Sequence, residues 1–411
     1  MDTMASPGKS AVLSSDWQSS ASEVLATELK LYGWLEKNQF KAYDTFDGLS
    51  SPLLRPFTFE RPLLRTVLLQ GVRRFPINLR PILGIKRAVS TKGMGFLARG
   101  YLRLYQATRD TRWLERAQDA LHWLVGQKLP GYSGACWGNH FDYQSRTFYL
   151  PRNTPTVVWT SLIGHAFLDA YELEGDSQWL ETAVSSCEHI LNDLERKEEK
   201  EGTCISYIPG KMSMVHNANT LAASLLARTA RHTGTASYLD LAQKSLQYTA
   251  NHQREDGAWY YGPAANLRWV DNFHTAYVLD CFKHYRDASD DGRFDKTMMQ
   301  GYAFWKDTFF LKDGTPRYYD TKTLPLDIQC CSQAIDTLIF FRDLDPASPE
   351  LAVQVARWTQ QNMADPDGYF YYRRYSKSLI NKTPTMHWGQ ATMFCALAAL
   401  YRELSEKDKN E

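Results

Sequence analysis

The sequence predicts an all-α fold in which six helical hairpins close into a ring, an (α/α)6 toroid. Two observations carry this prediction. The first is a repeated unit along the 411 residues: an amphipathic helix, a loop rich in glycine and aromatic residues, and then a more apolar helix. The second is its period, because successive apolar helices begin 54 to 63 residues apart. A hairpin alone leaves apolar surface exposed, and closing six into a ring buries it.

The amphipathic helices are expected to form the outside of the ring. In each of them, apolar residues recur three or four positions apart, which gives a helix one buried face. The expected ranges are 23–36, 113–127, 179–194, 238–253, 294–309 and 351–363.

The apolar helices are expected inside the ring. Proline suits the first turn of a helix, and Asn or Asp suits its N-cap. Segments such as 220–229 and 391–400 are apolar nearly all round. The alternative is an open helical solenoid, but that needs polar end repeats, and the last helix here is apolar. These helices are expected to begin near Lys92, Pro155, Asn217, Asp271, Asp327 and Pro384.

The domain prediction is a polar, flexible N-terminal tail over residues 1–20, followed by one toroid domain over 21–411. The tail lacks the basic start and apolar run of a signal peptide. The seven cysteines are scattered and odd in number, which favours a reducing compartment. We therefore expect a cytoplasmic protein. The net charge of +1 gives no sign of nucleic-acid binding.

A basic connector occupies residues 52–92, where nine Lys or Arg residues accompany a single acid, Glu60. One interpretation is contact with an anionic membrane surface or a membrane-bound synthase, which would place the protein at the inner face of the membrane. Another is a rim that attracts an anionic polysaccharide. A third is a connector packed on the ring with solvated charges. The basic residues are Arg55, Arg61, Arg65, Arg73, Arg74, Arg80, Lys86, Arg87 and Lys92.

Three segments carry a resemblance to known families. Residues 253–259 match the Q-x-x-x-G-x-W repeat of squalene-type cyclases. Residues 75–86 and 256–274 resemble uncharacterised bacterial polysaccharide-biosynthesis proteins of the same fold. Over roughly residues 75–402, the chain is similar to the six-hairpin glycosidase and terpenoid-cyclase toroids. The resemblance implies the ring fold, but this fold hosts hydrolases, lyases, epimerases, isomerases and cyclases.

The chemistry is expected at one end of the ring. Every loop that leads from an outer to an inner helix opens on that end, where helix N-termini favour anions. Trp and Tyr faces can cover sugar rings, and Arg can pair with an acidic sugar. The expected substrate-binding residues are Trp137, Arg146, Trp259, Tyr260, Arg268, Trp269, His274, Gln329, His387, Trp388 and Gln390.

Two kinds of catalysis remain open at this stage. Glycoside hydrolysis needs two carboxyl groups across a bond, and Asp271 is the preferred acid because aromatic neighbours would raise its pKa. Its alternative role is capping the inner helix. A uronic-acid lyase or epimerase would instead use His or Tyr as the base. The catalytic candidates are Asp271, Asp327, Asp142, His140, Tyr143 and His216.

No cofactor or metal is expected. Asp327, Cys330 and His387 resemble the zinc ligands of protein prenyltransferases in their order, but the Asp-to-Cys spacing differs. Residues 287–291 only approach the Asp-rich motif of terpene cyclases.

The sequence thus predicts a protein that acts on an oligo- or polysaccharide in exopolysaccharide or capsule assembly. A non-catalytic binding toroid and an isoprenoid-handling enzyme are the alternatives.

Overall fold

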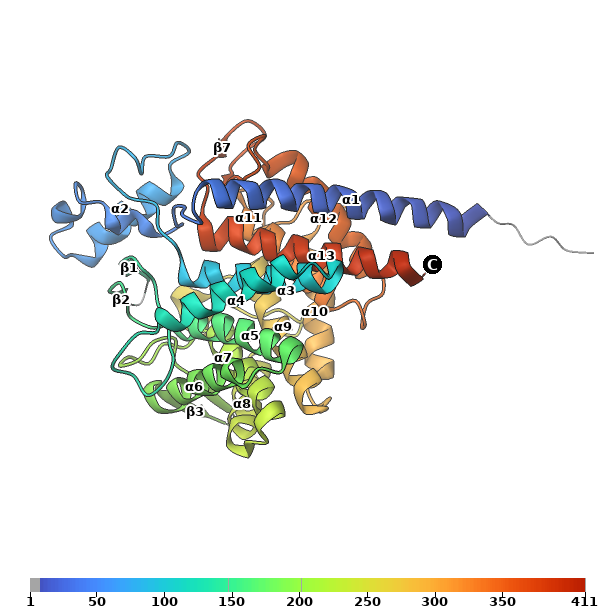
Figure 1. Ribbon diagram of the computed structural model, residues 1–411. Coiled ribbons are helices and arrows are strands. Elements are labelled where there is room, and N and C mark those ends of the chain that lie inside the picture. The colour runs from blue at the N-terminus through green and yellow to red at the C-terminus, as the bar shows by residue number, and fades with distance from the viewer. Residues whose placement is uncertain (1–7, 147, 201, 411) are drawn as a thin grey trace, which may run out of the picture.

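In the part of the chain that the structure describes, twelve α-helices form the ring, and a thirteenth, α2 (Pro62–Arg74), lies in the basic connector. The computed structural model describes residues 8–146, 148–200 and 202–410 (Figure 1). The outer helices are α1 (Gly8–Lys37), α4 (Thr111–Gly126), α6 (Ser177–Asp193), α8 (Ala236–Ala250), α10 (Asp295–Phe309) and α12 (Ser348–Met363).

The inner helices follow the outer ones in strict alternation. Each inner helix packs on the next, and the last packs on the first, so the ring is closed. This arrangement confirms the predicted toroid and excludes the open solenoid. The inner helices are α3 (Thr91–Thr108), α5 (Val157–Glu174), α7 (His216–Thr233), α9 (Asn272–Ser289), α11 (Ile328–Phe340) and α13 (Ala391–Asn410).

The expected starts of the inner helices are close to the observed ones because capping residues can be recognised in the sequence. Asp271 and Asp327 cap α9 and α11, accepting hydrogen bonds from the backbone of His274 and Gln329. The sixth inner helix differs: Pro384 lies outside it, and a π-helical turn (Met386–Gln390) precedes α13. This turn carries His387 and Trp388.

The first helix is longer than predicted. It begins at Gly8, so most of the expected tail 1–20 is helical, and residues 1–7 lie outside the described part of the chain. Residues 8–37 contain no proline that would stop a helix. In addition, Trp17 packs against the core and lies under Lys407 of α13. Helix α1 therefore extends into the segment that the sequence analysis treats as a tail.

Strands are confined to the loops. β1 (Tyr143–Gln144) pairs with β2 (Tyr149–Leu150), and β3 (Arg196–Glu199) with β4 (Gly202–Ile205), both antiparallel. A small third sheet has the order β5 (Leu326–Asp327), β6 (Arg373–Arg374), β7 (Ile380–Asn381).

The long loops gather at one end of the ring, together with the connector and α2 (Figure 1). The turns at the other end are short. Among the described helices, none has the length and apolar character needed to cross a bilayer.

Candidate active site

A cavity of about 370 Å³ opens at the loop-rich end, at the N-termini of the inner helices. Its size suits a small ligand such as one or two sugar rings. Its walls come from loops of several hairpins and from α2, which contributes Thr66, Gln70, Arg73 and Arg74. The connector is therefore part of the cavity and not only an outer attachment.

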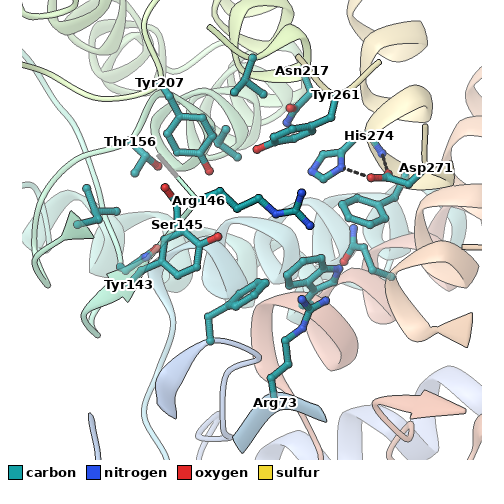
Figure 2. A pocket seen from close by; sticks show the side chains of 18 of the residues that line it. Arg73, Tyr143, Ser145, Arg146, Thr156, Tyr207, Asn217, Tyr261, Asp271 and His274 are labelled. Atoms are coloured by element: carbon teal, nitrogen blue, oxygen red, sulfur yellow. Dashed lines mark hydrogen bonds and ion pairs between the residues drawn. The ribbon is translucent and has the colours of Figure 1, made fainter. Parts of the chain in front are cut away.

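Asp271 holds His274 in a fixed orientation on the cavity wall (Figure 2). Its Oδ1 accepts the backbone N–H of His274 at 3.0 Å, and its Oδ2 accepts the His274 Nδ1–H at 2.7 Å. The indole of Trp269 donates to the same Oδ2 at 2.9 Å. Because a carboxylate can only accept, Nδ1 carries a proton, and in the neutral ring the lone pair is then on Nε2. His274 is therefore oriented as a base.

A second imidazole lines the same cavity. His387 contacts the buried carboxylate of Asp44 through Nδ1, and the His387 backbone N–H donates to Asp44 at 3.3 Å. His140 lies against the other oxygen of Asp44, 3.3 Å away. Burial raises the pKa of Asp44, but His387 and His140 outweigh it and leave the pKa below its usual value. Burial lowers the pKa of His387, and the adjacent Asp44 carboxylate opposes this change.

Positive charge dominates the cavity lining. The Arg146 guanidinium lies 4.6 Å from the centre of the Trp269 ring, and Figure 2 shows its side chain extending across the cavity toward His274. Arg73 stacks on Phe46 and donates to the Tyr372 hydroxyl at 2.8 Å. Burial lowers the pKa of Lys92 to about 8, although Asp44 opposes this change. The cavity therefore favours an anionic ligand.

Aromatic side chains supply most of the remaining lining. The Trp269 and Tyr261 rings stack with their centres 4.5 Å apart, and Trp388 packs edge-on against Phe273. Burial raises the pKa of the Tyr143 and Tyr261 hydroxyls, so both stay protonated and can donate hydrogen bonds. The tyrosines around the cavity are Tyr143, Tyr207, Tyr261, Tyr277, Tyr318 and Tyr319.

The structure brings eight of the predicted site residues to this cavity. They come from four separate loops or helix starts, which agrees with the expectation that one end of the ring collects them. They are Tyr143, Arg146, Trp269, Asp271, His274, Gln329, His387 and Trp388.

Trp137 and Trp259, by contrast, belong to the core. Both are buried, and their indole nitrogens donate to the carbonyl oxygens of Leu124 and Thr249 at 2.9 Å. Each indole N–H thus satisfies a backbone carbonyl in the last turn of an outer helix, α4 for Trp137 and α8 for Trp259. Neither ring lines the main cavity, and substrate binding by them stays a prediction from the sequence.

The other predicted carboxylates also have structural partners. Asp142 pairs with Arg55 and accepts the backbone N–H of Arg152. Asp327 caps α11 and is fully buried, and burial raises its pKa against the opposing charges of Arg373 and Arg73. Neither residue lines the main cavity, and their assignment as catalytic acids stays a prediction from the sequence.

The remaining candidates lie beside the main cavity or away from it. His140 faces Asp44. The side-chain amide of Gln390 accepts the backbone N–H of Phe370 and donates to the carbonyl oxygen of the same residue. Arg268 is exposed and donates to the carbonyl of Pro263. His216 and Tyr260 line a separate small cavity behind Asp271.

Sequence reasoning missed the contributions of the connector. Asp44, which holds His387, lies in the first long loop, where the sequence analysis selected no site residue. Arg73 and Lys92 were counted only as charges of a basic segment. The available signal was topological: the connector is itself the first loop from an outer to an inner helix, so its residues belong to the same end of the ring.

Among the described residues, no group of three or more His, Cys, Asp or Glu side chains is arranged to hold a metal ion. All seven cysteines are free and buried.

No protein-family model and no curated protein sequence matches the chain. Several solved structures do match it. A cellobiose 2-epimerase from Bacillus thermoamylovorans is 11% identical with a TM-score of 0.60, covering 77% of this chain and 88% of that one. The polysaccharide lyase BACCELL_00875 is 11% identical with a TM-score of 0.59, covering 94% and 98%. An α-mannanase from Bacteroides thetaiotaomicron is 13% identical with a TM-score of 0.57, covering 78% and 88%. The chain therefore has the (α/α)6 fold of the six-hairpin glycosidase-like toroids.

Proposed function

We propose that this protein is a carbohydrate-active enzyme that removes a proton from a carbon of an acidic sugar, as an epimerase, an isomerase or a lyase does. The observation that carries the proposal is His274, whose Nδ1–H is held by Asp271 while its ring lines a cavity that Arg146 enters. An imidazole held in this way leaves Nε2 free to accept a proton.

The reaction step follows from these groups. The Nε2 lone pair of His274 takes the proton, and the electron pair left on carbon moves onto the adjacent carbonyl or carboxylate as an enolate. Arg146 or Arg73 is placed to stabilise the resulting negative charge. His387, oriented by Asp44, offers a second group for returning a proton. In a lyase, the electron pair would instead expel the oxygen at the neighbouring carbon.

Hydrolysis is less well supported. It requires two carboxyl groups that face each other across the glycosidic bond. Among the described residues that line the cavity, Asp271 is the only acid. Both of its oxygens already accept hydrogen bonds, and its side chain is fully buried.

Two features support a sugar as the ligand. The faces of Trp269 and Trp388 suit the apolar faces of sugar rings, and the surrounding tyrosines suit hydroxyl groups. In addition, the structural neighbours are named as an epimerase, a lyase and a mannanase. The cationic lining supports an acidic sugar. A role in exopolysaccharide or capsule assembly and a cytoplasmic location remain predictions from the sequence.

The alternatives have less support from the site. A purely binding toroid has no need for a histidine fixed by a buried carboxylate. An isoprenoid-handling enzyme would need an apolar funnel, whereas Arg73, Lys92, Arg146 and two histidines line this one.

Proton exchange with deuterated water tests the proposal. The protein is incubated with uronic-acid-containing and neutral oligosaccharides, and NMR records deuterium at sugar carbons or an unsaturated product. We expect deuterium incorporation or elimination with an acidic sugar, and His274→Gln should reduce its rate by roughly 10²- to 10⁴-fold. His122→Gln, on outer helix α4, is the matched control. Release of a reducing sugar with no exchange at carbon would instead identify a hydrolase.

A further inference from the structure

Exposed apolar side chains are concentrated in the basic connector. Of the 14 large apolar residues that the described structure exposes, nine fall between residues 53 and 82. The other five are scattered over the rest of the chain. We call the nine the connector surface: Leu53, Leu54, Phe57, Phe59, Leu63, Val67, Phe75, Ile77 and Ile82.

The connector surface is displayed on a folded platform. The short helix η2 (Arg55–Thr58) packs against α2. The inner side of α2 buries Leu69 and Val72, and Val72 packs with Tyr43 and Ile85 in a small separate core. Leu63 and Val67, four positions apart, lie on the outer side and are 73% and 60% exposed. Figure 1 shows α2 and its flanking loops projecting from the loop-rich end of the ring. Exposed apolar patches of this kind commonly mark interaction sites.

The structure divides the basic residues of the connector into two groups. Five are used internally: Arg73 and Lys92 line the cavity, while Arg55, Arg65 and Arg80 pair with Asp142, Glu60 and Asp47. The other four are exposed: Arg61, Arg74, Lys86 and Arg87, of which Arg74 also lines the cavity. The only acid within residues 52–92 is Glu60, which pairs with Arg65. The outer face of the connector is therefore both apolar and cationic.

We propose that the connector surface docks on an anionic lipid bilayer. Leucine and phenylalanine side chains can enter the boundary between headgroups and acyl chains, while arginine and lysine pair with anionic headgroups. A second copy of this surface fits less well, because a symmetric dimer through it would bring the exposed cations of both copies together. The proposal does not depend on the proposed enzymatic activity.

Docking in this way would also orient the active site. Helix α2 exposes Leu63 and Val67, and it also contributes Thr66, Gln70 and Arg73 to the cavity. A protein held by α2 would keep its cavity close to the bilayer, within reach of saccharides anchored there.

Vesicle co-sedimentation of the full chain tests the docking surface. Vesicles of phosphatidylcholine alone are compared with vesicles that also contain phosphatidylglycerol, at low and high salt. We expect binding to the anionic vesicles that weakens as salt rises. The double variant Phe57→Ser/Leu63→Ser should bind at least tenfold more weakly. Its matched control, Leu29→Ser/Met299→Ser, alters exposed apolar residues on outer helices and should bind as the wild type does.

The charges are tested separately. Arg61→Gln/Lys86→Gln should weaken binding roughly fivefold for each cation removed. Lys296→Gln/Lys312→Gln, which alters two exposed lysines of the ring, should not weaken it. The proposal is overturned if neither type of vesicle binds the protein, or if the connector variants and their controls lose binding equally. It is also overturned if the wild type is a dimer in light scattering that Phe57→Ser/Leu63→Ser converts to monomer, because the surface would then join two copies. Circular dichroism should show unchanged helix content in every variant.

Discussion

Asp271 combines a structural and a positioning role. It caps α9, and it also holds the proton on Nδ1 of His274. The sequence suggested it as a general acid, whereas the proposed mechanism assigns proton transfer to the neighbouring histidine. Asp271→Asn separates the two roles, because asparagine caps helices about as well as aspartate but removes the negative charge.

We therefore expect Asp271→Asn to keep the fold and to lose activity by roughly 10²- to 10⁴-fold. Thermal unfolding measures the effect on the fold, and steady-state kinetics measure the effect on activity. Asp176→Asn, at the cap of outer helix α6, is the matched control for capping. Full activity in Asp271→Asn would show that His274 needs no carboxylate or is not the base.

Glu28 is a buried acid without a hydrogen-bond partner among the described residues. Glu28 belongs to α1, and its side chain is buried with neither carboxyl oxygen hydrogen-bonded. Burial raises the pKa of Glu28 well above 4.5, although the positive charge of Arg103 opposes this change. The folded protein thus binds this proton more tightly than the unfolded chain does. The stability it contributes is complete below the unfolded pKa and is lost as the pH rises through the folded pKa.

Glu28→Gln should remove this pH dependence. Between the unfolded and folded pKa, the wild type loses about 1.4 kcal/mol of stability per pH unit relative to the variant. Chemical denaturation at a series of pH values from 4 upward measures the difference. A constant difference across this range would show that Glu28 is ionised inside the fold.

Tryptophans in similar sequence contexts occupy different environments in the structure. Trp137, Trp259 and Trp269 all precede an inner helix in an aromatic loop, but only Trp269 lines the cavity. The position of a loop between an outer and an inner helix indicates which end of the ring its residues occupy. Whether it points into the core or the cavity depends on packing between hairpins, which no local pattern encodes.

At the scale of elements, helix periodicity and caps were sufficient to locate the ring helices. The connector was harder because its fold depends on single long-range contacts. Arg80 is 1% exposed and donates to Asp47 at 2.7 Å and to the carbonyl of Asp44 at 2.9 Å. It therefore fastens the segment that presents Asp44 to His387.

Removing the Arg80 side chain should destabilise the connector more than it destabilises the ring. Arg80→Met leaves Asp47 buried without its cation, and such a loss typically costs about 3–5 kcal/mol. We expect faster limited proteolysis between residues 40 and 90, together with reduced activity. Arg87→Met, which alters an exposed cation of the same connector, is the control. Unchanged proteolysis in Arg80→Met would show that packing alone holds the connector.

At the scale of the whole molecule, charged residues link the inner helices at the end opposite the cavity. Asp169 of α5 accepts Arg99 of α3 at 2.7 Å and Arg228 of α7 at 2.8 Å. Arg103 of α3 pairs with Asp336 of α11 at 2.5 Å. Three neighbouring helices thus share Asp169, and α3 also reaches across to α11. No local sequence pattern indicates this network, because its members are far apart along the chain.

A closed ring whose inner helices all pack on two neighbours should unfold as one unit. We expect Asp169→Ala to lower the free energy of unfolding by about 3–5 kcal/mol, because two buried guanidinium groups lose their shared partner. Burial raises the pKa of Asp169, but Arg99 and Arg228 outweigh it, so the pKa is held well below its usual value. The stabilisation is therefore present above the unfolded pKa near 3.8 and is lost as the pH falls through the folded pKa.

Calorimetry tests both the size of this effect and its cooperativity. The Asp169→Ala variant should show one transition at a lower temperature, and its difference from the wild type should shrink only in strong acid. Asp240→Ala, which breaks an exposed pair with Lys244 on outer helix α8, should change little. In an open repeat array, local damage would instead separate the melting of neighbouring repeats. A split transition in Asp169→Ala would mean that the hairpins on either side of α5 unfold independently, and closure of the ring would then contribute little to stability.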